Sequence, residues 1–285
     1  TIDDAQLVDL EAYIISALEQ YNVPGAAVSI VQDGEIVYAE GFGIRDPATG
    51  EPVTPETRMM IGSTSKTLTT LLMAALVDAG LMSWDTPVAD VLPDFAVADP
   101  ELSGEITLEN LVCACTGVPR RDLELVFNGE GMTAEDVVES LQSFEFYTDF
   151  GEAFQYSNQM VAAGGYAAAA ADGGEFGDLY DAYRSSVQER VLGPIGMGAT
   201  TLSLDDVIAS ANYATPHTLN LDMSYTPAPM AMESLFLDPI APAGAYWSNV
   251  LDMARYLQMQ LTDGVALDGT IVVSPENLAR TRTPQ

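Results

Sequence analysis

Apolar residues near the start of the chain recur every three or four positions and then give way to strand-like runs. The helical spacing is carried by Leu7, Leu10, Ile14, Leu18 and Tyr21. This periodicity predicts an amphipathic helix that ends before Pro24-Gly25.

A hairpin is predicted next. The runs "AAVSIV" and "EIVYAEGFG" are rich in β-branched and aromatic residues, and Asp33-Gly34 separates them. An Asp-Gly pair between two such runs is a strong hairpin signal, because both turn positions need a positive φ.

The rest of the chain is predicted to be mostly helical. The expected helices cover Ser65 to about Ala79, and then lie near 107–115, 133–143, 157–171, 178–192 and 248–262. The run "VAAGGYAAAAA" at 161–171 is far shorter than the roughly 20 residues of a membrane span. It predicts a close-packed buried helix, and no membrane span is expected.

Charge excludes two classes of partner. The chain has 42 acidic and 10 basic residues and a formal charge of −32, while 48% of its residues are hydrophobic. Nucleic acid and anionic membranes need a positive face, so we expect no binding to either. The acidity is compatible with adaptation to salt and equally with an acidic protein from ordinary conditions.

Cysteine and histidine are too few for a metal site of familiar spacing. Cys113 and Cys115 are two positions apart and His217 is the single histidine. A bridge between such close neighbours is usually strained, so two buried thiols are expected, with a redox or metal role as the alternative. No metal and no cofactor are predicted.

The first residues, "TIDDAQLVDLEAYI", contain no basic segment followed by an apolar core. A removed signal peptide and a trimmed chain are equally compatible with this start.

The single lysine is the first candidate for chemistry. Lys66 follows Ser63 by three positions in "IGSTSKTLTT". If a helix begins near residue 64, both side chains project to one side, so an amine lies beside a hydroxyl at a helix N-terminus. A serine becomes a nucleophile when a neighbouring base takes its proton, which a lysine of lowered pKa can do. The alternative is a capping serine beside a solvated lysine.

A second element lies about ninety residues downstream, where "FQYSNQM" supplies Tyr156 and Asn158. In this order and at this distance, the two motifs resemble those of the penicillin-recognising serine hydrolases. That family comprises class C β-lactamases, DD-peptidases, D-aminopeptidases and esterases of the same fold.

The resemblance covers residues 1 to about 280. Blocks similar to those of the family are "GAAVSIVQDGEIVYAEGFGIRD", "GLMSWDTPVADVLPDF", "ITLENLVCACTGVPRRD", "RVLGPIGMGAT" and "APAGAYWSNVLDMARYLQMQL", in the family's order. It implies a β-lactamase/transpeptidase-like fold, with an antiparallel sheet flanked by helices and a second, all-α lobe. The α/β lobe would hold about residues 1–60 and 245–285, and the helical lobe about residues 61–244.

The resemblance also implies roles for the motif residues. Ser63 would be the nucleophile, Lys66 its proton partner and Tyr156 the general base or proton shuttle. Asn158 would donate a hydrogen bond to the substrate, and the Ser63 N–H would form half of the oxyanion hole.

Several positions depart from the family pattern. Ala114 replaces a usual histidine, and Pro242-Ala243-Gly244-Ala245 replaces P-A-G-G, with Gly244 expected to contact substrate. The family's third motif, K-T-G or H-x-G on a strand, has no counterpart here, nor have its later strands. Because two strands seldom make a stable sheet, we expect a second fragment or chain to complete it.

His217 lies in "NYATPH", which is similar to a family stretch whose last aromatic residue lines the rim of the site. Contact with substrate is one interpretation, and a surface or core histidine is the other.

The sequence thus predicts a serine hydrolase that acts through an acyl-enzyme on a small ester or amide. An esterase is favoured because no cationic carboxylate-binding cluster is evident. A β-lactamase, a D-amino-acid peptidase or DD-peptidase, and a catalytically silent binding module are the alternatives. Export from the cytoplasm is favoured because many relatives are exported.

Overall fold

A three-stranded antiparallel sheet forms one end of the molecule. The computed structural model describes residues 2–128, 131–222 and 224–284. The first elements are the helix α1 (Asp4–Tyr21) and the strands β1 (Gly25–Gln32), β2 (Glu35–Asp46) and β3 (Glu51–Pro52), in the sheet order β1-β2-β3. The β1–β2 turn has Asp33 at φ 54° and Gly34 at φ 82°, as the predicted hairpin requires.

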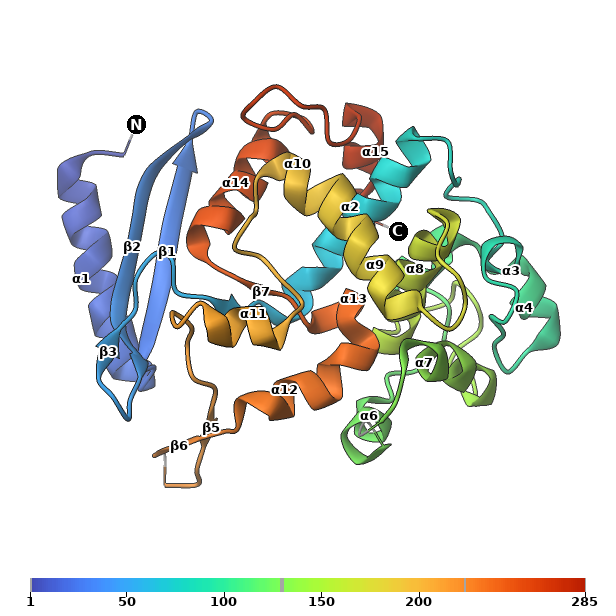
Figure 1. Cartoon of the computed structure of the whole chain (residues 1–285), viewed down its shortest axis with the longest axis horizontal. Helices are drawn as coiled ribbons and strands as arrows, with labels where there is room; N and C mark the ends of the chain where they lie inside the picture. The colour runs from blue at the N-terminus through green and yellow to red at the C-terminus, as the bar shows by residue number, and fades with distance from the viewer. Residues whose placement is uncertain (1, 129–130, 223, 285) are drawn as a thin grey trace.

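Two helices enclose this sheet. Helix α1 contacts β2, and α14 (Val250–Leu261) packs on β1 and β2 from the other side, as Figure 1 shows. The Gln258 amide of α14 donates a hydrogen bond to the Gly34 carbonyl at 2.6 Å. Asp3 caps the start of α1 and accepts from the backbone N–H of Gln6, so this helix begins one residue after a carboxylate.

The core lies in the helical part of the molecule. Its centre is formed by α2 (Ser65–Asp78), α8 (Asn158–Ala171), α9 (Leu179–Val187) and α13 (Ala241–Gly244). The alanine- and glycine-rich α8 is buried over most of its length, as its composition predicts. Gly165 is needed there, because a Cβ at this position would lie 2.4 Å from the Pro242 side chain.

Shorter elements surround this core. They are the helices α3 (Val88–Val91), α4 (Pro100–Glu105), α5 (Leu108–Val112), α6 (Asp122–Asn128), α7 (Ala134–Ser140), α10 (Gly193–Ile195), α11 (Leu204–Ala209), α12 (Met230–Leu237) and α15 (Pro275–Arg280), the short helical turns η1 (Gly62–Thr64), η2 (Leu141–Ser143), η3 (Gln188–Leu192) and η4 (Asp238–Ile240), and the strands β5 (His217–Leu219) and β6 (Tyr225–Pro227). Each helical segment that the sequence pattern predicts contains a described helix, but α5 ends at Val112, so the predicted helix near 107–115 extends too far.

A second small sheet joins distant parts of the chain. Strand β4 (Met59–Met60) pairs with β7 (Trp247–Ser248), and Ile61 donates its N–H to the Tyr246 carbonyl at 2.9 Å. The segment 246–248 is thereby held beside the turn that carries Ser63. Trp247 is buried, as expected of a core residue.

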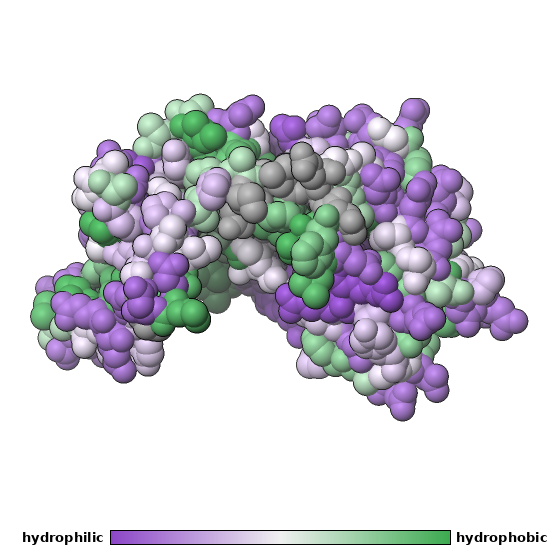
Figure 2. All heavy atoms as spheres, turned by 90° about the horizontal axis from the view of Figure 1, so that it is seen from below, coloured by the Kyte–Doolittle hydropathy of each residue, from purple (hydrophilic) through white to green (hydrophobic). Residues whose placement is uncertain are grey.

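The last described helix, α15, lies on the helical part. Asp78 at the end of α2 accepts hydrogen bonds from Ser274 and Asn277, and Arg280 pairs with Glu109 at 2.6 Å. Of the segment 245–285, α14 therefore packs on the sheet and α15 on α2. Seen from below, a hollow separates the sheet side from the helical side (Figure 2).

The expectation of two buried thiols is wrong. Cys113 and Cys115 form a disulfide with their Cα atoms 5.2 Å apart, and both residues are half-buried. The bridge closes because Ala114 between them adopts a left-handed conformation with φ 56°, which brings the two side chains to the same side.

No helix among the described residues is long and apolar enough to cross a membrane.

Candidate active site

Ser63 lies in the tight turn that leads into α2. The turn η1 spans Gly62–Thr64 and continues directly into Ser65. Gly62 has φ 53°, which a residue with a Cβ adopts only at a cost, so glycine here sets the path of the backbone before the serine. The Ser63 side chain is exposed. Its N–H lies in the first turn, where backbone donors have no intrahelical acceptor.

Lys66 points back at Ser63 from the first turn of α2. Its Nζ atom lies 3.2 Å from Ser63 Oγ, 2.7 Å from Asn158 Oδ1 and 2.7 Å from the Ala243 carbonyl oxygen. These three partners match the three donors of an ammonium group. They also suit a neutral amine, which would donate to Asn158 and Ala243 and accept the proton of Ser63.

Tyr156 completes the contact with the serine. Its hydroxyl lies 2.7 Å from Ser63 Oγ, and either oxygen can be the donor. The Lys66 amine lies 4.8 Å from the centre of the same ring. Ser157 caps α8, so Tyr156 is held just before that helix and Asn158 begins it.

The loop before Tyr156 is fixed by the segment that contains the disulfide. Gln155 donates its N–H to the Ala114 carbonyl at 2.7 Å, and Gly151 donates to the Cys115 carbonyl at 2.8 Å. Ala114, which stands where the family pattern has a histidine, thus supports the loop before Tyr156 through its backbone carbonyl.

The electrostatics of the site lower two pKa values. Burial lowers the pKa of Lys66 and Arg120 adds to this, although Tyr156 and the charge of Asp122 oppose it. Burial alone would raise the pKa of Tyr156, but its interactions with Lys66 and Ser63 and the charges of Lys66 and Arg120 outweigh burial, and the pKa is lowered. Both groups therefore release a proton more readily than a free lysine or tyrosine side chain does.

Two further residues join this group and were not predicted from the sequence. Asp122 accepts a hydrogen bond from Asn158 Nδ2 at 2.9 Å. It also forms an ion pair with Arg120 through the Nε atom of that arginine. The Arg120 guanidinium also lies 5.3 Å from the centre of the Tyr156 ring. The sequence signal was the cluster "PRRD", because adjacent arginines are unusual in a chain with ten basic residues.

Gly244 is brought to the neighbourhood of the site, but His217 is not joined to it. Gly244 is buried in α13, one residue after Ala243, whose carbonyl accepts a hydrogen bond from Lys66. His217 lies in the β5–β6 hairpin against Tyr225, with ring centres 6.3 Å apart, and its Nε2 is buried without a hydrogen-bond partner. We call Ser63, Lys66, Tyr156 and Asn158 the Ser63 group. Among the described residues, no hydrogen bond or ring contact links His217 to this group.

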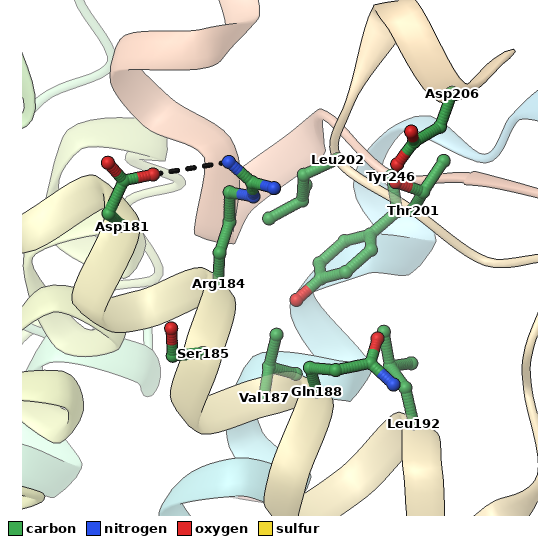
Figure 3. A pocket seen from close by; sticks show the side chains of 10 residues that line it. All are labelled: Asp181, Arg184, Ser185, Val187, Gln188, Leu192, Thr201, Leu202, Asp206 and Tyr246. Atoms are coloured by element: carbon green, nitrogen blue, oxygen red, sulfur yellow. Dashed lines mark hydrogen bonds and ion pairs between the residues drawn. The ribbon is translucent and has the colours of Figure 1, made fainter. Parts of the chain in front are cut away.

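A separate cavity of about 340 Å³ lies beside α9. Its lining includes Arg184, which is paired with Asp181, and Tyr246, and none of the motif residues contributes to it (Figure 3). In the described part of the chain, no cluster of three or more His, Cys, Asp or Glu side chains is placed to hold a metal ion.

The arrangement can therefore move a proton. A hydroxyl exposed to solvent contacts a phenol and an amine, both of lowered pKa, and each of them can receive the serine proton.

Comparison with known proteins gives a family match over nearly the whole chain. The family model described as "Beta-lactamase" matches residues 10–285. Among solved structures, the octameric penicillin-binding protein homologue from Pyrococcus abyssi superposes with a TM-score of 0.80 at 26% identity, over 97% of this chain and 60% of that one.

Curated relatives show slightly higher sequence identity than this solved structure. An unguisins hydrolase of Aspergillus violaceofuscus is 29% identical over 87% of this chain and 44% of its own length. Penicillin-binding protein 4 of Amycolatopsis lactamdurans is 28% identical over 92% of this chain and 66% of its own length. The chain thus spans less than two thirds of the length of these relatives.

Proposed function

Because this chain belongs to the beta-lactamase family and has the fold of a penicillin-recognising serine hydrolase, we propose that it hydrolyses an ester or amide bond through an acyl-enzyme on Ser63. The observation that carries the proposal is the contact of Ser63 Oγ with both Tyr156 and Lys66, at 2.7 and 3.2 Å. A serine with two candidate bases at hydrogen-bond distance meets the requirement for nucleophilic catalysis.

The proposed reaction has two steps. Ser63 Oγ attacks the substrate carbonyl carbon while its proton passes to Tyr156 or Lys66, and that proton then goes to the leaving alcohol or amine as the acyl bond breaks. Water next loses a proton to the same pair and attacks the acyl-enzyme, which releases the acid and returns the proton to Ser63. The Ser63 N–H is proposed as one donor to the oxyanion.

The remaining residues have proposed substrate contacts. Asn158 uses one Nδ2 hydrogen for Asp122 and has a second for the substrate. Gly244 is proposed to border the acyl group from α13. A contact between His217 and the substrate would require the substrate to extend as far as the β5–β6 hairpin.

Within the family we favour an esterase with a small acyl group. Apart from Arg120, the described contacts of the Ser63 group include no arginine, so a substrate carboxylate finds little positive charge there. The formal charge of −32 also disfavours anionic substrates over long distances.

Arg120 supports a second candidate, a β-lactamase or a D-amino-acid or DD-peptidase. Its side chain is 61% exposed and lies beside the Tyr156 ring. An arginine at this position is placed to bind a substrate carboxylate, which penicillins and peptide C-termini carry.

The test is hydrolysis of p-nitrophenyl acetate, p-nitrophenyl butyrate and nitrocefin by the protein and by Ser63→Ala. Ester turnover that the substitution abolishes supports the serine hydrolase, and the ratio of ester to nitrocefin turnover separates the two candidates. A catalytically silent binding module, the remaining alternative, would turn over none of them and would resist labelling by a fluorophosphonate.

We also propose that a further segment or chain adds strands to the sheet. In the described residues the backbone of β1 pairs with β2 alone, which leaves its other edge open. Activity of the 285-residue chain by itself, equal to that of a longer form, would contradict a requirement for added strands.

For the compartment, we propose export to an oxidising environment. The disulfide between Cys113 and Cys115 supports this, because disulfides are rare where glutathione keeps thiols reduced. Thiol alkylation in acid-quenched cells, followed by mass analysis of the chain, should find both cysteines unmodified; two alkylated cysteines would contradict the proposal.

A further inference from the structure

Asn158 presents opposite ends of its amide to two different groups. Its Oδ1 accepts from Lys66 Nζ at 2.7 Å, and its Nδ2 donates to Asp122 Oδ1 at 2.9 Å. An asparagine amide has nearly the same shape when it is turned over, so its neighbours decide which end faces which group.

Asp122 makes this choice unambiguous. An ionised carboxylate only accepts hydrogen bonds, so the amide nitrogen must face Asp122 and the amide oxygen must face Lys66. The second carboxylate oxygen of Asp122 accepts from Arg120 Nε at 2.5 Å. A continuous chain of contacts therefore runs from Arg120 through Asp122 and Asn158 to Lys66.

We propose that Asp122 is a positioning residue, which fixes the Asn158 amide so that its oxygen holds the Lys66 amine beside Ser63. Asp122 touches neither Ser63 nor Lys66 through a described hydrogen bond, so it acts through Asn158 and through its charge. Its effect on turnover rests on the proposed function, whereas its effect on Lys66 is independent of any reaction.

Two substitutions separate these contributions. Asp122→Asn keeps the size of the side chain and an oxygen that can accept from Asn158, but removes the negative charge. Asp122→Ala removes both. Glu124→Gln is the matched control, because Glu124 lies on the same helix, α6, and pairs with Arg121 instead.

The single lysine allows a direct measurement. Protein made with 13Cε-lysine gives one side-chain signal, which reports the ionisation of Lys66 without any substrate. The groups that act on Lys66 are Tyr156, Asp122 and Arg120; Tyr156 and Asp122 favour the ammonium form, and Arg120 disfavours it. We expect the pKa of Lys66 to fall in Asp122→Asn and Asp122→Ala, and to stay unchanged in Glu124→Gln.

Turnover gives the second measurement. We expect kcat/KM to fall about 10- to 100-fold in Asp122→Ala, mainly through kcat, because a displaced Lys66 is no longer aligned with Ser63. Asp122→Asn should lie between Asp122→Ala and the parent protein. Circular dichroism checks that each variant is folded. If Asp122→Ala does not fold, Asp122→Asn alone tests the positioning role.

The two proposals fail differently. If no variant or parent protein hydrolyses an ester, the proposed function fails, and the Lys66 titration still tests Asp122. If Asp122→Asn gives the same Lys66 titration and the same kcat/KM as Glu124→Gln, the positioning role is overturned.

Discussion

At the scale of single residues, Lys66 is the one lysine of the chain and arginine cannot replace its chemistry. A guanidinium stays protonated, so Lys66→Arg can neither accept the Ser63 proton nor fit the three contacts of Nζ. We predict a folded variant whose kcat/KM is about a thousandfold lower, within the range of general-base contributions. Arg184→Lys, a surface exchange in the opposite sense, is the control. More than a tenth of the parent activity in Lys66→Arg would argue against a proton-accepting lysine.

Arg120 provides a prediction on pH dependence. Its charge lowers the pKa of both Lys66 and Tyr156, so its removal raises both. If the deprotonated forms accept the Ser63 proton, activity rises as pH increases through these values, and the rising limb must move to higher pH in Arg120→Gln. The kcat/KM profile for a neutral ester measures this.

The control for that experiment is Arg121→Gln, which removes the same charge one residue away. Arg121 pairs with Glu124 and lies over the Phe144 ring, and it is not among the groups that shift the pKa of Tyr156. Equal profiles for Arg120→Gln and Arg121→Gln would show that only the total charge of the molecule matters.

At the scale of elements, the packing of α8 against α13 links the core to the site. A Cβ at Gly165 would lie 2.4 Å from the Pro242 side chain, and the next residue of α13, Ala243, holds Lys66 through its carbonyl. We predict that Gly165→Ala lowers the free energy of unfolding by about 1–3 kcal/mol, as overpacking does. Activity should fall as well, because α13 must shift.

Gly104→Ala is the matched control for this packing. Gly104 lies in α4, and a Cβ there has no atom within 4 Å. In an exposed helix, alanine should instead raise the free energy of unfolding by about 0.4–1 kcal/mol. Urea unfolding of both variants measures the two effects, and a change of the same sign in both would contradict the packing argument.

The elements themselves were largely predictable from the sequence, because each rests on local signals. The spacing of Leu7, Leu10 and Ile14 and the Asp33-Gly34 turn place α1 and the β1–β2 hairpin where the structure has them. The Ser63–Lys66 pair follows from helical geometry in the same way.

The missed features depend on contacts between distant segments. Asp122 reaches Asn158 across 36 positions, and no periodicity connects them. The Cys113–Cys115 bridge depends on the left-handed backbone of Ala114, a conformation that alanine seldom adopts and that composition does not reveal.

At the scale of the whole molecule, charge should make stability depend on salt. Only seven ion pairs form among the described residues, against 42 acidic residues in the chain, so self-repulsion outweighs attraction. The Debye length falls from about 30 Å at 0.01 M to about 10 Å at 0.1 M salt. We therefore predict that Tm rises over this range of sodium chloride, and a fall would mean that the ion pairs dominate.

Higher salt separates the two explanations of the acidity. Simple screening is nearly complete at 1 M, where the Debye length is about 3 Å, so an ordinary acidic protein should show a plateau in Tm beyond that concentration. A surface adapted to salt should gain further stability from hydrated cations between 1 and 3 M. Tetramethylammonium chloride at equal ionic strength is the control, because it screens charge equally but binds water weakly. A continued rise of Tm in sodium chloride alone supports salt adaptation, and equal curves in the two salts support ordinary acidity.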